Sequence, residues 1–129
     1  MAVNPYQIYR QSSVQTASPA QLVIMLYDGA VRFVKQSIEH MENRDIEGTH
    51  TCLIKAQSIV HELVASLNFD YPISKNLAQV YEYLLHLLIT ANVRKKKEPA
   101  EEALIHLTEL REAWVQASKT NAKSQEQHG

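Results

Sequence analysis

The six histidines are the residues of this chain with the most versatile chemistry, because an imidazole can bind a metal or move a proton near neutral pH. Di-iron helical bundles place a histidine three residues after a glutamate, so that both side chains point inward. Here the nearest pairs, Glu82 with His86 and Glu102 with His106, are spaced one residue wider and fall on polar helix strips. We therefore expect solvated side chains, with no metal site and no cofactor, at His40, His50, His61, His86, His106 and His128.

The chain also lacks the sequence patterns that organise nucleophilic or phosphate chemistry. It has no Gly-x-Ser-x-Gly elbow, no glycine-rich phosphate loop and no His-Glu-x-x-His zinc motif. Asp28 and Glu39 fall on the polar flank of a predicted helix and do not pair as acid and base. Cys52 lies beside an apolar seam, where we expect a buried packing thiol. The sequence therefore predicts that this protein is not an enzyme.

Length and charge narrow the class of protein further. A chain of 129 residues fits one domain with its own core. The net charge of −1 comes from acidic and basic residues mixed along the chain, which argues against nucleic-acid binding. A single cysteine suits a reducing compartment, and residues 1–11 have no apolar signal core. The longest apolar run, residues 22–27, is too short to insert in a membrane. We expect a cytosolic protein.

Helical periodicity runs through almost the whole chain, and its breakers separate four predicted helices. Ser18 and Gln21 match a capping box, with Pro19 at the first helical position of a helix over 19 to about 41. Asp45 is the expected cap of a second helix that runs to about residue 67, and Ser74 that of a third to about 93. Pro99 is expected to open a fourth helix, which ends near residues 117–119.

Short connections between four helices favour an antiparallel packing. The predicted fold is all-α, an antiparallel up-down four-helix bundle over residues 18–119. Residues 1–17 are expected to form a mobile N-terminal cap segment, helical or extended, and residues 120–129 a disordered C-terminal tail.

The first and third predicted helices have unusually wide apolar faces. On a helical wheel their apolar arcs span roughly 220° and roughly 240°, about twice what a core-facing helix needs. The core absorbs this surplus, or else the N-terminal segment, a second copy or a foreign helix covers it. The candidate partner-binding residues on these faces are Ile24, Tyr27, Val31, Tyr81, Leu84 and Leu88.

A basic run, residues 94–97, follows the third helix. Cations there favour the negative end of the helix dipole, so a solvated helix terminus is the plainest interpretation of Arg94 through Lys97. Contact with an acidic partner or with nucleic acid is the alternative, and the sequence leaves the role of this run open.

The motifs of the chain resemble one known family. The string Thr-Ala-Ser-Pro over residues 16–19 leads into Met-Leu-Tyr-Asp-Gly-Ala over residues 25–30. Further motif residues are Tyr6 and Tyr9 upstream, Tyr81 in the third helix, and the Leu-Arg-x-x-Trp pattern that ends at Trp114. Over residues 4–118 the chain resembles the flagellin-specific export chaperones, the FliS family. It departs from them at the strongly basic connection after Asn92.

The resemblance implies a function that composition alone does not. It implies a chaperone that binds the C-terminal helical region of monomeric flagellin in apolar grooves, prevents premature polymerisation and delivers flagellin to the flagellar type III export gate. It also implies that Ile8 and Tyr9 contact the partner, and that the N-terminal segment covers part of the groove until flagellin displaces it. When free, the protein is expected to be a monomer or a weak dimer; the alternative is a self-associating structural bundle.

Overall fold

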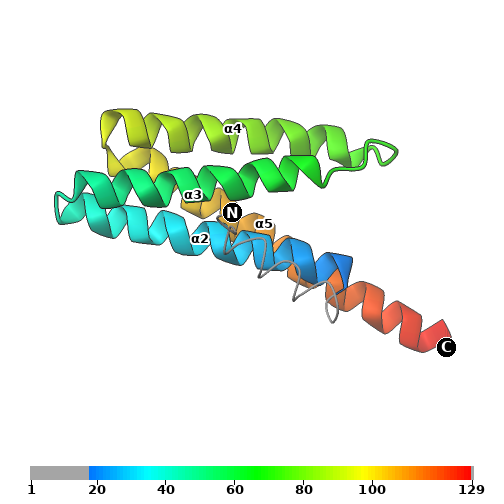
Figure 1. Cartoon of the computed structure of the whole chain (residues 1–129). Helices are drawn as coiled ribbons and strands as arrows, with labels where there is room; N and C mark the ends of the chain where they lie inside the picture. Colours follow the sequence, from blue (N-terminus) through cyan, green and yellow to red (C-terminus); the bar gives the residue numbers. More distant parts are fainter. Residues whose placement is uncertain (1–17, 129) are drawn as a thin grey trace, which may run out of the picture.

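The computed structural model describes residues 18–128 of the chain, with side chains over 18–120. The predicted cap segment, residues 1–17, lies outside the described residues. Within them the backbone forms four helices and no strand, as an all-α fold requires. The helices are α2 (Pro19–Glu42), α3 (Ile46–Ala65), α4 (Ile73–Arg94) and α5 (Lys97–His128), joined by short turns (Figure 1).

The starts of α2 and α3 are set by local capping, as predicted. The Ser18 hydroxyl accepts a hydrogen bond from the Gln21 N–H, and the Gln21 side chain accepts one from the Ser18 N–H, at 3.2 and 2.9 Å. Asp45 caps α3 by accepting from the Gly48 N–H at 2.9 Å. Each side chain satisfies a backbone donor that a helix end would otherwise leave unpaired.

The start of α4 corrects a prediction. Ser74 does not cap the helix, because Pro72 is the N-cap residue and makes no side-chain capping bond. The Ser74 hydroxyl is buried and donates instead to the carbonyl oxygen of Asn68 at 2.6 Å. Ser74 thus holds the α3–α4 turn against the helix start rather than capping it.

The extent of α5 also differs from the prediction. The helix begins at Lys97, and Pro99 is its third residue, where a missing N–H costs no intrahelical bond. The backbone stays helical to His128, past the predicted end near residues 117–119, and its last turns extend beyond the start of α2 (Figure 1). Whether residues 120–129 are disordered in solution stays a prediction.

The helices pack in a closed ring in which each touches two neighbours. The order is α2, α3, α4, α5 and back to α2, and over the described residues the backbones of the two diagonal pairs stay apart, so that only side chains meet across the bundle. This is the arrangement of an up-down four-helix bundle, confirming the predicted fold class. A polar side-chain contact marks each edge of the ring: Gln36–Cys52, His50–Asn92, Tyr83–Glu102 and Asp28–Arg111.

The core runs along the axis of this ring. Buried alanines and larger aliphatic residues fill it. Gly29 allows α2 to approach α3 closely, because an added Cβ would lie 3.1 Å from the Ile59 Cδ1 atom. The fully buried apolar core consists of Tyr27, Ala30, Val34, Leu53, Ala56, Val60, Leu63, Tyr81, Leu84, Leu88, Ala91, Ala100, Ala103 and Leu107.

Two turns meet at one end of the bundle, and each places a basic residue in the left-handed region. Arg44 follows α2 with φ of 57°, and Lys95 ends α4 with φ of 52°. The Lys95 ammonium group donates to both the carbonyl and the side-chain oxygen of Asn92, each at 2.6 Å. Part of the basic run is therefore structural, since Lys95 satisfies a carbonyl at the end of α4.

Candidate partner-binding surface

Ile24 and Val31 lie on the edge of α2 that faces α5. Ile24 lies four residues before Asp28 and Val31 lies three residues after it, so all three share one helix face. Asp28 pairs with Arg111 of α5, which places this face beside α5. Both apolar side chains are half-buried, so part of each stays open to solvent. This edge of the bundle, defined by Ile24 and Val31, is called the α2/α5 edge.

Tyr27 and Tyr81 lie inside the bundle, not on its surface. Their hydroxyl oxygens are 2.5 Å apart, and their rings are tilted at 51° with centroids 6.4 Å apart. Burial is the largest cause that raises the pKa of each phenol above its ordinary value, because the charged phenolate loses its hydration. A hydrogen bond from the Trp114 side chain acts on the pKa of Tyr27 in the opposite direction. The pair is a neutral, hydrogen-bonded element of the core.

Leu84 and Leu88 are also fully buried. The core therefore takes most of the wide apolar arcs expected on α2 and α4, leaving narrower exposed strips at their edges. Of the eight candidate residues, only Ile24 and Val31 are both described and partly accessible. Ile8 and Tyr9 lie outside the described residues, so their role stays a prediction.

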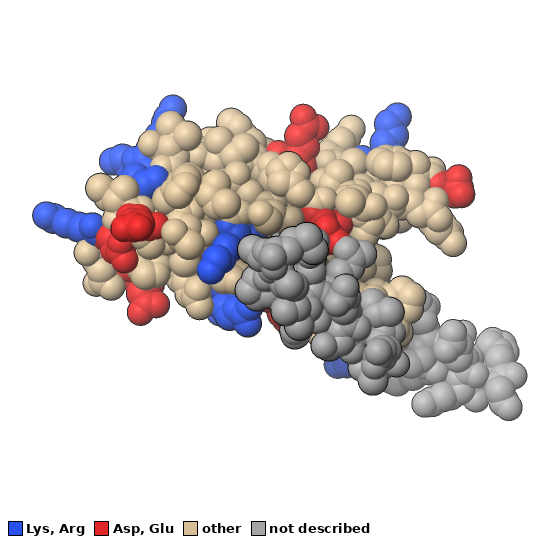
Figure 2. Space-filling view, viewed as in Figure 1, with Lys and Arg blue, Asp and Glu red and all other residues tan. Residues whose placement is uncertain are grey.

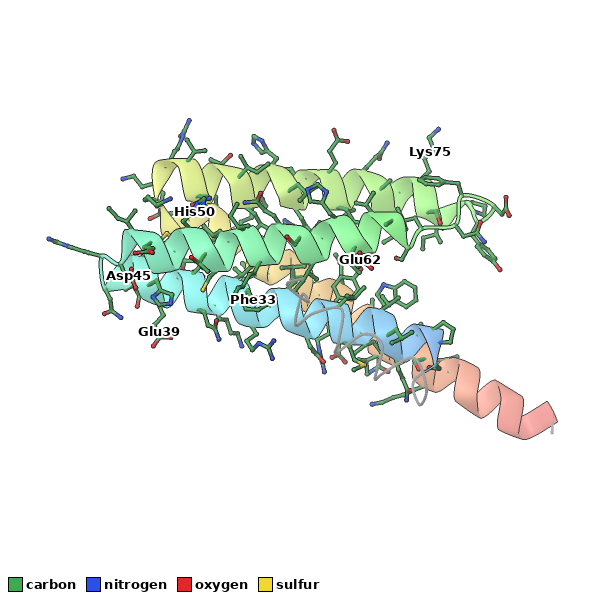
Figure 3. All side chains as sticks on the ribbon, viewed as in Figure 1. Phe33, Glu39, Asp45, His50, Glu62 and Lys75 are labelled. Carbon is green, nitrogen blue, oxygen red and sulfur yellow. The ribbon has the colours of Figure 1, made fainter. Side chains whose placement is uncertain are left out.

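The largest exposed aromatic side chains lie where no candidate was selected. Phe69 and Tyr71 in the α3–α4 turn are 65% and 63% exposed, and Ile73 at the start of α4 is 62% exposed. Two aromatic residues in the seven-residue turn over 66–72 were a signal for an apolar surface, but helical periodicity does not extend into turns. Phe33, labelled in Figure 3, was also not selected; it is half-buried on α2, with the cations of Arg32 and Lys55 5.2 and 5.4 Å from its ring centroid.

The polar groups do not assemble a reactive site among the described residues. No group of three or more histidine, cysteine or carboxylate side chains is placed to hold a metal there. Glu102 pairs with His106 at 3.5 Å on the surface, and His40 pairs with Asp45 at 3.0 Å beside the α3 cap. Burial raises the pKa of the Cys52 thiol, which disfavours the reactive thiolate.

One open pocket of about 280 Å³ lies at the end of the bundle where the two left-handed turns meet. Two of its charged groups already have structural roles, since Asp45 caps α3 and Lys95 bonds to Asn92. The pocket is lined by Met41, Arg44, Asp45, Ile46, Thr49 and Lys95.

Comparison with known proteins decides the family. The family model described as "Flagellar protein FliS" matches residues 2–121. The chain belongs to the FliS family. It is 36% identical to the flagellar secretion chaperone FliS of Bacillus subtilis over 98% of this chain and 93% of that protein. It is 34% identical to that of Salmonella typhimurium, over 87% of this chain and 85% of the relative. With the Escherichia coli chaperone it shares 30% identity, over 86% and 84%.

Membership in the FliS family makes this chain a flagellar export chaperone, in agreement with the sequence analysis. It is a family of chaperones rather than of enzymes, and a flagellar protein is the implied partner in export. No helix over the described residues of this FliS-family chain is long and apolar enough to cross a membrane.

Proposed function

We propose that this chaperone binds the C-terminal helical region of monomeric flagellin in the cytosol and holds it until export. Bound flagellin would be unable to polymerise, and the complex would deliver it to the flagellar type III export gate. Family membership supports this proposal, together with the half-exposed apolar side chains along the α2/α5 edge. An amphipathic helix laid against such an edge would bury its own apolar face without any catalytic group.

In this proposal Ile24 and Val31 make the first contacts with flagellin. Tyr27, Tyr81, Leu84 and Leu88 form the packed floor beneath, and they would touch flagellin only if the helices separated. Ile8 and Tyr9 are proposed to contact the partner from the N-terminal segment. The free chaperone is proposed to be a monomer or a weak dimer.

Calorimetric titration of the full chain with flagellin tests the proposal. We expect a one-to-one complex that is lost when the C-terminal helices of flagellin are removed. Undiminished binding of the truncated flagellin would refute the proposal. A stable dimer in light scattering that ignores flagellin would instead favour a self-associating structural bundle.

Substitutions on the α2/α5 edge locate the contact. Ile24→Asp and Val31→Asp should each weaken flagellin binding about tenfold or more, since a charge then meets an apolar partner face. Ile105→Asp is the matched control, because Ile105 is an aliphatic residue of α5 that is 57% exposed and is not part of the α2/α5 edge. Unchanged affinity in both α2 variants, or a loss with Ile105→Asp as large as theirs, would contradict a contact at the α2/α5 edge.

A further inference from the structure

The α3–α4 turn and the first two turns of α4 contribute little to the core of the bundle. Over residues 64–80 no apolar side chain is buried, whereas Leu63 before this stretch and Tyr81 after it are both buried. Residues 66–80, which comprise the turn and the start of α4, are called the α4 entry segment. Its large apolar side chains that are more than half exposed are Phe69, Tyr71 and Ile73.

The hydrogen bonds of the α4 entry segment do not join it to α2 or α5. The carbonyl oxygen of Asn68 accepts from the Ser74 hydroxyl at 2.6 Å and from the Tyr71 N–H at 3.1 Å. The Asn68 side chain accepts from the Asp70 N–H at 3.0 Å. Figure 2 shows only scattered charged side chains over this end of α3 and α4. Among the described residues, no side chain of the segment forms a hydrogen bond or ion pair with α2 or α5.

The start of α4 is also held less firmly than the start of α2. Both helices pack between α3 and α5, but α4 packs less closely against each of them. The start of α2 has a capping box, whereas the start of α4 has no side-chain cap. The turn before α4, residues 66–72, is the longest connection between the described helices (Figure 1). The start of α2 likewise has no buried apolar side chain before Tyr27, so capping and closer packing distinguish the two.

The Tyr27–Tyr81 hydrogen bond marks the point where α4 becomes firmly held. Tyr81 is the first buried apolar residue of the helix, and its hydroxyl bonds to that of Tyr27 across the core. Beyond it, Tyr83 bonds to α5 and Asn92 bonds to α3. The buried apolar residues of α4 then continue with Leu84, Leu87, Leu88 and Ala91.

We propose that the α4 entry segment is a gate that unfolds locally while the remainder of the bundle stays folded. Local unfolding requires the least free energy where few apolar contacts are buried and few bonds reach the rest of the protein. Residues 66–80 meet both conditions. The Tyr27–Tyr81 pair is the latch at which this unfolding stops.

An open gate would uncover one side of the buried tyrosine pair. Leu77 and Ala78 precede Tyr81 by one turn on the same helix face, so their departure exposes Tyr81. A partner would then reach Tyr81, which is enclosed in the closed bundle, without separating α2 from α3 or α5. This consequence rests on the proposed function, but the opening does not, so a chain that failed to bind flagellin would still open.

Hydrogen exchange of the backbone amides, measured by NMR on the free full chain, tests the gate. The fifth to eighth residues of each helix are matched positions, because each donates to a carbonyl of its own helix. Residues 77–80 of α4 should be protected about tenfold or more weakly than residues 50–53 of α3 and residues 23–26 of α2.

Low urea concentrations separate local from global unfolding. Exchange at residues 77–80 should hardly depend on urea, because local opening exposes little surface. Exchange at Leu84 and Leu88 should rise steeply with urea, because it requires the whole bundle to unfold. Strong urea dependence at residues 77–80, or protection equal to that of residues 50–53, would overturn the proposal.

The variant Tyr27→Phe tests the latch. Because Tyr81 then lacks its partner hydroxyl, residues 81–85 should join the gate, and their exchange should change from urea-dependent to urea-insensitive. Tyr83→Phe is the matched control, since it removes a hydroxyl that bonds to another helix at the surface, and it should leave residues 81–85 unchanged. An unchanged pattern in Tyr27→Phe, or the same change in both variants, would refute the latch.

Discussion

At the residue scale, the buried tyrosine pair is the most specific polar interaction in the core. Tyr27 and Tyr81 share one hydrogen bond at 2.5 Å within the apolar core, and the Trp114 side chain also bonds to Tyr27. A hydroxyl left unpaired in such surroundings costs more than a hydrogen bond contributes. The pair therefore favours one register of α2 against α4 across the bundle, because sliding either helix by a turn would separate the two hydroxyls.

The destabilisation caused by removing both hydroxyls should be smaller than the sum of the destabilisations caused by removing each one alone. Tyr81→Phe and Tyr27→Phe should each lower the free energy of unfolding by about 1–3 kcal/mol, because the remaining hydroxyl loses its hydrogen bond across the bundle. The double variant should cost less than the sum of the two. Urea unfolding of all four proteins measures this coupling. Strict additivity would show that the two hydroxyls do not depend on each other.

The same pair should make the protein sensitive to alkaline pH. The pKa of each phenol is raised in the folded state from its ordinary value of 10.0, mainly by burial. Above about pH 10 the unfolded chain therefore loses tyrosine protons that the folded chain keeps, and the free energy of unfolding falls as pH rises. Below that pH both states keep these protons, and the pair contributes no pH dependence.

Urea unfolding at about pH 8 and about pH 11 tests the sign of this effect. The double variant Tyr27→Phe with Tyr81→Phe should lose less stability between the two pH values than the parent chain does. An equal loss in both proteins would assign the alkaline sensitivity to other groups.

At the scale of the helices, capping should set the stability of the two N-termini. Asp45→Ala and Ser18→Ala should each cost about 1 kcal/mol, since each removes the acceptor for a backbone N–H. Ser58→Ala, on the exposed middle of α3, is the control and should change stability by less than about 0.5 kcal/mol. Thermal melts monitored by circular dichroism measure all three. A control variant as destabilised as Asp45→Ala would contradict the capping role.

The elements that the sequence predicted well are those set by near neighbours. Ser18, Gln21 and Asp45 bond to backbone groups within three residues, so their role is visible in the local pattern. Ser74 was assigned as a cap for the same reason, but its hydroxyl bonds to Asn68, six residues away across a turn. A pattern of residue types cannot separate those two outcomes, because both use a serine near a helix start.

The depth of the candidate residues was not predictable in the same way. A helical wheel gives the direction of Tyr27 and Tyr81, but it does not show how closely the opposite helix approaches. Both are fully enclosed, whereas Ile24 and Val31, on the same wheel arc, stay half-open because they lie at an edge. Whether they contact flagellin stays a prediction. The family itself was recognisable because its motifs cover most of the chain.

At the scale of the whole molecule, all four helices contribute to one core, whereas the α2/α5 edge belongs to two of them. A charge in the core should therefore unfold the whole bundle, and a charge on the edge should mainly weaken flagellin binding. Leu63→Asp should lower the melting temperature far more than Ile24→Asp does, because Leu63 is fully buried. Circular dichroism melts of both variants measure the difference, and the reverse order would contradict this division into core and edge.

The two residues with left-handed backbone conformation, in the turns at one end of the bundle, have a consequence for engineering. Arg44 and Lys95 occupy a backbone region that glycine enters without steric penalty. Arg44→Gly should therefore raise the melting temperature by a few degrees, worth about 1 kcal/mol. Lys95→Gly should gain less, because it also removes both bonds to Asn92. A chain with arginine and lysine at these corners is less heat-resistant than its own topology allows, and selection for thermostability should reach Arg44 first.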